Sequence, residues 1–239
     1  MPDIGYPTPR GELAAYLAVP HAGAPWPGVV VIQDVLGLND DLREQADRLA
    51  AYGYLALAPS LYSAGGGLRC VAATIQAARS GSGRAYEDID AARQYLAGRE
   101  DCTGRVGVIG FCMGGGFALL AAPRYGFAAA SVNYGEVPDD AEDRLAGCCP
   151  VIGSYGGRDR RLADHPARLE RALTALGVEH DVKVYPEAGH GFLNRWNTGP
   201  GLTPLLRISG VGHHHASAED AWRRIGEFFD THLHEGTGA

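Results

Sequence analysis

Short apolar runs bounded by turn-forming residues recur along the chain, and they alternate with segments whose apolar positions follow helical spacing. Runs of about four to eight residues rich in Val, Ile and Leu are typical of strands buried on both faces of a parallel sheet. We predict such strands at residues 13–19, 28–33, 54–59, 105–109, 127–133, 150–155 and 180–185.

Helices are predicted between these strands where apolar residues recur every three or four positions. The first predicted helix runs from about residue 40 and ends at Gly53, and two others lie at residues 84–98 and 117–122. A fourth contains Leu169, Leu173 and Leu176 and ends at Gly177, and the final helix contains Leu233. Ser217, with Asp220 three residues later, is expected to cap the final helix. This alternation predicts a single α/β domain, with a mostly parallel sheet and helices on both faces.

Composition narrows the class of protein. The 239 residues suffice for one large domain, and 46% hydrophobic with 21% charged residues is ordinary for a soluble enzyme. The formal net charge of −7 disfavours nucleic acid and anionic membranes as partners, and five cysteines give no sign of a disulfide framework. The N-terminus lacks the pattern of a signal peptide and no apolar run approaches the ~20 residues of a membrane span, so we expect a cytoplasmic protein.

The most informative motif lies between the predicted strand at residues 105–109 and the helix at 117–122. It reads Gly110-Phe111-Cys112-Met113-Gly114, which matches the nucleophile elbow G-x-S-x-G with cysteine in place of serine. The N–H groups and the dipole of a helix N-terminus would stabilise a thiolate at Cys112. The alternative is an inert core cysteine, because free cysteines are often simply buried.

Three further polar residues each follow a predicted strand. Asp34 ends the strand at 28–33, Asp159 follows 150–155, and His190 follows 180–185. Since the carboxyl ends of parallel strands meet at one edge, these side chains should converge near Cys112. Taken alone, an aspartate in a glycine-rich turn is usually a turn former, and a histidine between glycines is often a surface residue. The order nucleophile, acid, histidine is that of α/β-hydrolases and favours a Cys112-Asp159-His190 triad.

These motifs resemble those of the dienelactone hydrolase family over nearly the whole chain. The matching segments are residues 31–39, 58–62, 108–115 and 187–192. The resemblance implies an α/β-hydrolase fold and assigns the family's catalytic triad to Cys112, Asp159 and His190. It also implies an oxyanion hole made by the backbone N–H groups of Val35 and Met113.

The chain departs from the family pattern around the substrate. The family's resting thiol is controlled by a glutamate, and the shorter Asp34 stands at that position. The arginines that hold a substrate carboxylate have no clean counterpart, because Asn194 occupies the expected place and Arg195 follows it. We expect Tyr134 and Arg195 to contact substrate. Other arginines lie in a divergent Gly/Ser-rich stretch, namely Arg69, Arg79 and Arg84.

Other motifs do not indicate a metal or a cofactor. His213, His214 and His215 are consecutive in the extended segment between Arg195 and Ala216, and adjacent residues point in different directions, whereas zinc ligands are spaced. The glycines at 65–67 lack the Gly-Lys-Ser/Thr of a phosphate loop, and those at 107–115 do not have dinucleotide-binding spacing. We therefore expect no metal and no cofactor.

The sequence thus predicts a hydrolase that cleaves a small-molecule ester or lactone through a thioester on Cys112. Two alternatives remain open. The first is a thioesterase or general carboxylesterase that uses the same triad. The second is a ligand-binding protein on a hydrolase scaffold that has lost catalysis.

Overall fold

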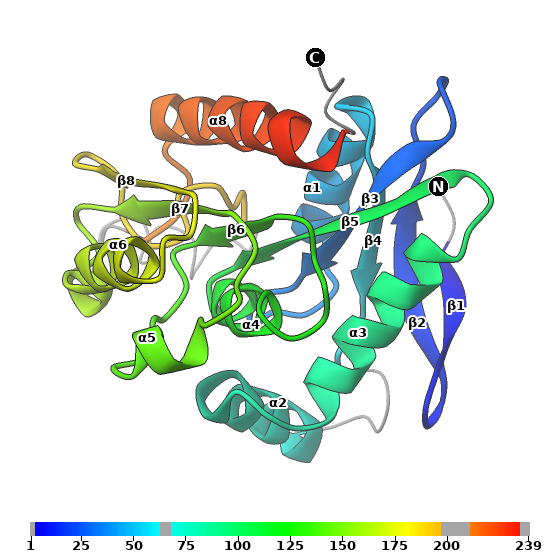
Figure 1. Ribbon diagram of the computed structural model, residues 1–239, viewed down its shortest axis with the longest axis horizontal. Helices are drawn as coiled ribbons and strands as arrows, with labels where there is room; N and C mark the ends of the chain where they lie inside the picture. Colours follow the sequence, from blue (N-terminus) through cyan, green and yellow to red (C-terminus); the bar gives the residue numbers. More distant parts are fainter. Residues whose placement is uncertain (1–2, 63–67, 197–210, 235–239) are drawn as a thin grey trace.

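A single mixed sheet organises the protein, as Figure 1 shows for the computed structural model, which describes residues 3–62, 68–196 and 211–234. Its strand order is β1-β2-β4-β3-β5-β6-β7-β8. The strands are β1 Asp3–Thr8, β2 Gly11–Ala18, β3 Trp26–Ile32, β4 Leu55–Pro59, β5 Cys102–Phe111, β6 Ala130–Asn133, β7 Val151–Gly156 and β8 His180–Tyr185. The pairs β1–β2 and β2–β4 are antiparallel and the other pairs are parallel, which confirms the predicted mostly parallel sheet.

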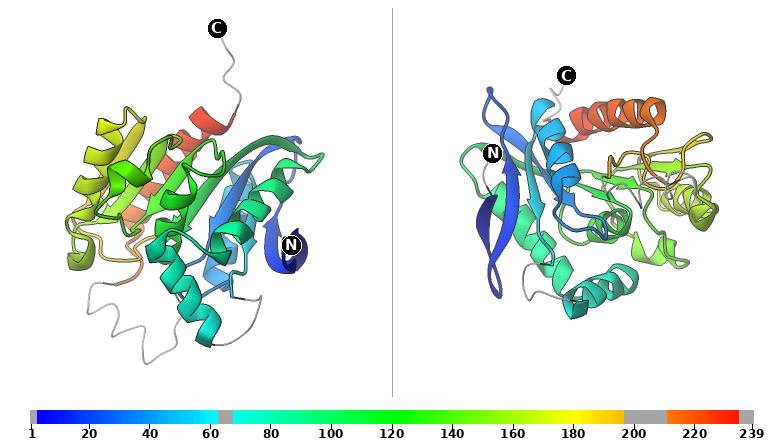
Figure 2. Two further views of the ribbon diagram at one scale, coloured as in Figure 1. Left: turned by 60° about the horizontal axis from the view of Figure 1, so that its bottom comes forward. Right: turned by 180° about the vertical axis from the view of Figure 1, so that it is seen from behind.

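Helices lie on both sides of this sheet. They are α1 Asp40–Ala51, α2 Leu68–Ser80, α3 Arg84–Ala97, α4 Met113–Ala121, α5 Ala141–Arg144, α6 His165–Ala175 and α8 His215–Leu233, with a 3-10 turn at Arg160–Leu162. Helices α1 and α8 cover one face and α3 and α4 the other (Figures 1 and 2). The central parallel strands therefore have both faces buried, and Val29, Val30, Val31 and Ile32 of β3 are fully inaccessible to solvent.

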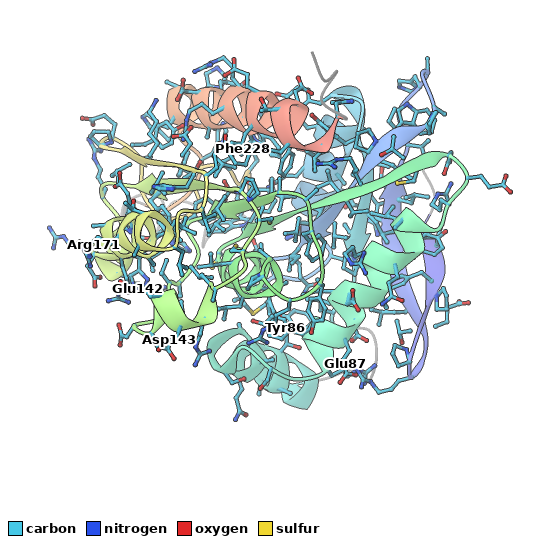
Figure 3. The ribbon with its side chains drawn as sticks, in the orientation of Figure 1. Tyr86, Glu87, Glu142, Asp143, Arg171 and Phe228 are labelled. Carbon is cyan, nitrogen blue, oxygen red and sulfur yellow. The ribbon has the colours of Figure 1, made fainter. Side chains whose placement is uncertain are left out.

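Helix α3 also packs on α4, the helix that follows Cys112. The ring of Tyr86 on α3 lies 5.0 Å from that of Phe117 on α4, and Tyr86 is 1% exposed. In Figure 3 Tyr86 points into the molecule, whereas charged side chains of these and neighbouring helices lie outside, among them Glu87, Glu142, Asp143 and Arg171. This contact fixes α4 between the sheet and α3, and so holds the turn from which α4 starts.

Among the described elements, strand β1 and helix α2 are the longest that the sequence pattern does not predict; the short helix α5 and the 3-10 turn are not predicted either. Strand β1 contains Gly5 and Pro7, which are poor strand formers, and it exists because it pairs with β2 along its whole length. Helix α2 lies at residues 68–80, where the sequence shows only a divergent Gly/Ser-rich stretch. Both lie at the periphery, so their omission leaves the predicted core unchanged.

The predicted start of the final helix is wrong. Helix α8 begins at His215, and its N-cap is His214, with extended backbone, instead of Ser217. Ser217 lies in the first helical turn, where its Oγ is 2.8 Å from His214 Nδ1. The sequence pattern indicates a cap at Ser217 because this residue precedes the main apolar stripe of the helix. In the structure the helix begins half a turn earlier, and the contact between His214 and Ser217 holds this additional half turn. Leu233, which was expected on this helix, is its last residue.

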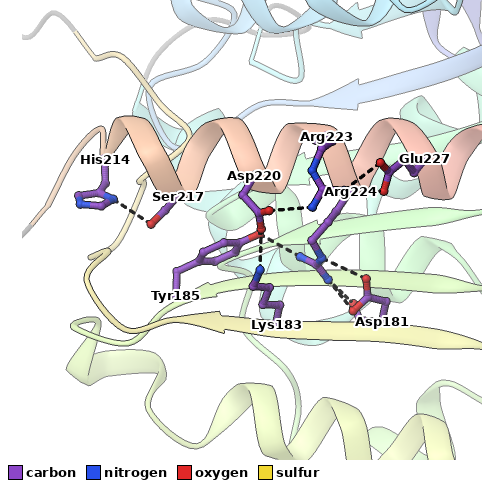
Figure 4. A network of polar contacts seen from close by, with 9 residues as sticks. All are labelled: Asp181, Lys183, Tyr185, His214, Ser217, Asp220, Arg223, Arg224 and Glu227. Carbon is purple, nitrogen blue, oxygen red and sulfur yellow. Dashed lines mark hydrogen bonds and ion pairs between the residues drawn. The ribbon is translucent and has the colours of Figure 1, made fainter.

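A polar network joins α8 to β8, the edge strand that leads toward His190 (Figure 4). Asp220 accepts hydrogen bonds from Lys183 at 2.6 Å and from the Tyr185 hydroxyl at 2.9 Å. Arg224, 8% exposed, pairs with Asp181 at 2.6 Å and donates to the Tyr185 hydroxyl at 3.1 Å. Since an edge strand has a neighbour on one side only, these contacts supply the anchoring that a second strand would give.

We predict that Arg224→Ala lowers the free energy of unfolding by about 1–2 kcal/mol, because it removes a buried side chain and leaves the buried Tyr185 hydroxyl without this donor. Arg223→Ala is the matched control, since Arg223 is the neighbouring arginine of the same helix with a side chain 57% exposed. Surface ion pairs contribute little, so the control should change stability much less than Arg224→Ala does. Urea denaturation of both variants gives the comparison, and equal losses would contradict the role assigned to Arg224.

Candidate active site

Cys112 lies at the sharp turn between β5 and α4, with φ 56° and ψ −117°. A non-glycine residue with positive φ is strained, and the turn needs close backbone approach on both sides. A Cβ at Gly110 would lie 1.9 Å from the Gly114 carbonyl oxygen, and one at Gly114 would lie 2.3 Å from the Ile32 carbonyl oxygen. The two glycines of the motif are therefore required, and the turn has the geometry expected of a nucleophile elbow.

The three residues expected to form a triad lie together. His190 Nε2 is 3.1 Å from Cys112 Sγ, and His190 Nδ1 is 2.5 Å from Asp159 Oδ2. Asp159 follows β7 and caps the 3-10 turn, where its other oxygen accepts from the Arg161 N–H at 3.2 Å. The imidazole thus bridges the sulfur and the carboxylate, which is the contact pattern of nucleophile, base and orienting acid.

The electrostatics of the site favour a charged histidine. Burial lowers the pKa of His190, but the hydrogen bonds and negative charges of Asp159 and Cys112 outweigh burial and raise the pKa to about 9. Burial in turn raises the pKa of Asp159, but the hydrogen bond and charge of His190 outweigh it, so this pKa is lowered overall. This raised pKa favours the imidazolium form of His190 at neutral pH.

A cavity of about 110 Å³ opens next to the sulfur. Its lining comprises Val35, Ala78, Cys112, Met113, Gly116, Tyr134, Glu136, Arg161, Leu162 and His190. Val35 and Met113, whose N–H groups were expected to form the oxyanion hole, thus flank Cys112 in this cavity. The hydroxyl of Tyr62 lies between them, 3.3 Å from the Val35 carbonyl oxygen and 4.0 Å from Met113 Sδ.

Tyr134 lines the cavity, but its side chain is committed to other contacts. Its backbone has φ 41°, and its ring lies edge-on to His190 with 5.3 Å between the ring centroids. The hydroxyl donates to Asn194 Oδ1, and Asn194 Nδ2 donates to Asp41 at 2.6 Å. Tyr134 is 1% exposed, its ring packs against the imidazole, and its hydroxyl is occupied by the hydrogen bond to Asn194.

The arginine at the cavity differs from the expected one. Arg195 lines a second hollow, together with Asp41, Arg48 and Glu219, and its backbone N–H donates to Asp41 at 2.7 Å. Arg161 lines the cavity at Cys112 instead. Its place two residues after Asp159, the expected acid of the triad, is the sequence signal for Arg161. The side chains of Arg69 and Arg79 lie outside the described residues.

Asp34 is 3% exposed and both carboxylate oxygens are engaged. Oδ1 accepts from the Leu36 N–H at 2.7 Å, and Oδ2 accepts from the indole N–H of Trp196 at 2.6 Å. Burial raises its pKa, while these hydrogen bonds and the positive charge of His190 act in the opposite direction. Asp34 is thus electrostatically coupled to His190, and its oxygens bond to Leu36 and Trp196.

The three consecutive histidines occupy different surroundings. His213 lines the second hollow, His214 contacts Ser217, and His215 begins α8. Among the described residues no group of three His, Cys, Asp or Glu side chains is placed to hold a metal ion. Of the helices within the described ranges, none has the length and apolar content needed to cross a bilayer.

The sequence is similar to a known protein family and to individual members of it. The model of the "Dienelactone hydrolase family" matches residues 13–233. A Yersinia pestis protein named "Putative carboxymethylenebutenolidase" is 30% identical over 246 residues, with 95% of this chain and 86% of the relative covered. A protein of the same name from Methylorubrum extorquens is 30% identical over 244 residues, with 95% and 79% covered.

The fold is also similar to that of solved structures. The crystal structure described as "Putative Dienelactone Hydrolase" from Klebsiella pneumoniae subsp. pneumoniae has a TM-score of 0.80 and 26% identity, covering 97% of this chain and 98% of that chain. A dienelactone hydrolase from Anabaena variabilis has a TM-score of 0.69 and 20% identity, with 97% of each chain covered. At that identity the second comparison concerns the fold alone, which is that of the α/β-hydrolases.

We predict that His190→Gln shifts the pH profile of Cys112 alkylation by iodoacetamide toward alkaline pH. The wild-type imidazolium persists below pH 9 because its pKa is raised to about 9, and it stabilises the reactive thiolate throughout that range. Glutamine keeps a polar side chain but carries no charge. Alkylation rates from pH 5 to about 10, followed by mass spectrometry of the Cys112 peptide, give both profiles. Superimposable profiles would contradict the charge assigned to His190.

Proposed function

The chain belongs to the dienelactone hydrolase family, and on that premise we propose that it hydrolyses a small ester or lactone through a thioester on Cys112. The observation that supports this most directly is the contact series Asp159–His190–Cys112 beside a cavity. A protein that only binds ligands has no need of a strained cysteine paired with a charged histidine.

In the proposed acylation, the Cys112 thiolate attacks the carbonyl carbon and a carbon–sulfur bond forms. The electron pair of the carbonyl moves to oxygen, and the backbone N–H groups of Val35 and Met113 are the proposed donors to this oxyanion. When the tetrahedral species collapses, the bond to the ester oxygen breaks. His190 gives its proton to that oxygen, while Asp159 holds the imidazole in position.

In the proposed deacylation, neutral His190 accepts a proton from a water molecule as the water attacks the thioester carbon. A second tetrahedral oxyanion forms at the same donors. Its collapse breaks the carbon–sulfur bond, releases the acid and returns the thiolate beside the protonated imidazole. Esters and lactones with a good leaving oxygen suit this chemistry, because a thiolate is itself easily expelled and activates amides poorly.

We propose two further roles at this site. The negative charge of Asp34 disfavours a second negative charge on the sulfur, and so restrains the thiol until a substrate binds. Arg161, which lines the cavity together with the acidic Glu136, would attract an anionic group of the substrate. Cleavage of acyl thioesters or simple carboxylesters by the same triad is the alternative that a substrate panel distinguishes.

The function is tested with a panel of a dienelactone, p-nitrophenyl esters and acyl thioesters, assayed with wild-type protein and with Cys112→Ser. We expect Cys112→Ser to keep the fold and to lose at least about 100-fold in kcat/KM, because a serine hydroxyl is ionised far less readily than a thiol. Cys102→Ser is the control, since Cys102 begins β5 at the opposite end of that strand. Lack of turnover by the wild-type protein would favour the ligand-binding alternative.

The restraint by Asp34 is tested with Asp34→Asn. Removing the negative charge should shift the pH profile of Cys112 alkylation toward acid pH and make the thiol more easily oxidised. Asn keeps the size of the side chain and one oxygen for the Leu36 N–H. Alkylation rates and peroxide sensitivity of both proteins are the measurements, and a profile that does not move would remove Asp34 from control of the thiol.

Arg161→Met should raise KM about tenfold for esters that carry a carboxylate on the acyl group and leave KM for neutral esters unchanged, because a charge-assisted contact contributes about 1.5 kcal/mol. Arg160→Met is the matched control: it removes the same charge one residue away, on a side chain that is not part of the cavity lining. Equal effects on charged and neutral esters would contradict a role of Arg161 in recognising anions.

A further inference from the structure

The turn that carries Val35 is closed by the side chain and the backbone of Asp34. Asp34 Oδ1 accepts from the Leu36 N–H at 2.7 Å, and the Asp34 carbonyl accepts from the Gly37 N–H at 3.2 Å. Gly37 has φ +81°, and a Cβ there would lie 3.1 Å from the ring of Tyr62. Two hydrogen bonds therefore enclose the Val35 peptide, and its orientation depends on where the Asp34 carboxylate lies.

Trp196 holds the other oxygen of this carboxylate. Its indole N–H donates to Asp34 Oδ2 at 2.6 Å. The indole passes closely over Gly191, the residue after His190: a Cβ at Gly191, where φ is +72°, would lie 2.3 Å from Trp196 Cη2. The indole thus joins the segment that bears His190 to the turn that bears Val35.

We propose that Trp196 is a positioning residue for the oxyanion hole, acting on the Val35 amide through Asp34. This inference rests on the proposed function, because it assumes that Val35 donates to an oxyanion. Without the indole N–H, one oxygen of a carboxylate that is 3% exposed loses its partner. An unsatisfied buried oxygen is costly, so the carboxylate rotates toward another donor and the Leu36 hydrogen bond that shapes the turn is weakened.

Two reactions of the same sulfur separate this role from an effect on the thiol. An alkyl trifluoromethyl ketone adds reversibly to the thiolate: a carbon–sulfur bond forms and the carbonyl electron pair moves to oxygen, which produces an oxyanion with no leaving group. Iodoacetamide reacts by displacement of iodide at a methylene carbon and forms no oxyanion. Only the first reaction uses the Val35 amide.

The test compares Trp196→Phe with wild type at pH 8. We expect the inhibition constant of the trifluoromethyl ketone to rise about tenfold, less than the 10²–10³ seen when a donor is removed outright, because the amide is displaced and not lost. The alkylation rate should stay within about twofold, since no oxyanion forms. Trp26→Phe is the matched control, because the Trp26 indole N–H also donates one hydrogen bond, to the Ala22 carbonyl oxygen at 2.9 Å, at the other end of β3.

A double-mutant cycle ties the effect to Asp34. In an Asp34→Ala background, Trp196→Phe should have no further effect on ketone affinity, because the carboxylate through which it acts is gone. Equal losses in ketone binding and alkylation, unchanged ketone binding, or additive effects in the cycle would each overturn the inference. Failure of the proposed function is a separate outcome, seen as absence of ester turnover by the wild-type protein, and it leaves the ketone comparison intact.

Discussion

The close approach of backbone at the β5–α4 turn is the constraint on which the rest of this site depends. Cys112 can project from the end of a buried strand only because the peptides around it lie in direct contact with those of β3 and of the segment after β6. A Cβ at Gly115 would lie 2.8 Å from the Asn133 carbonyl oxygen, and one at Gly135 would lie 2.5 Å from the Gly115 carbonyl carbon. Side chains are excluded there, so the sulfur, the α4 N-terminus and the strand ends occupy fixed relative positions.

This constraint explains which parts of the fold and of the site could be predicted from the sequence. The glycines of the elbow are a local requirement and are visible in the sequence as Gly110 and Gly114. Strands β3 to β7 follow from apolar runs, because a strand with both faces buried needs apolar side chains on both sides. The convergence of Asp159 and His190 on Cys112 follows from the rule that strand ends meet at one edge. The fold class and the convergence of these three side chains could therefore be inferred from periodicity and motif order, whereas the family was inferred from the resemblance of whole motifs.

Contacts between distant segments were not predictable in the same way. Trp196 reaches Asp34 across 162 positions of sequence, and Asn194 reaches Asp41 across 153. Neither contact has a periodic pattern, because each depends on how a connection after β8 lies over α1 and the β3 turn. Arg161 differs from these two: it lies two residues after Asp159, and its place at the cavity follows from the 3-10 turn that Asp159 caps.

These distant contacts also accommodate the chain's departures from the family pattern. Where the resemblance leads one to expect a glutamate, the shorter Asp34 is met by an indole N–H, and where it leads one to expect an arginine, Asn194 connects Tyr134 to Asp41. Both partners lie on the segment that follows His190. This segment continues from edge strand β8, which depends on α8 for its anchoring through Asp220 and Arg224. The geometry of the imidazole, of Tyr134 and of the Val35 turn is thus tied to how firmly one helix holds one edge strand.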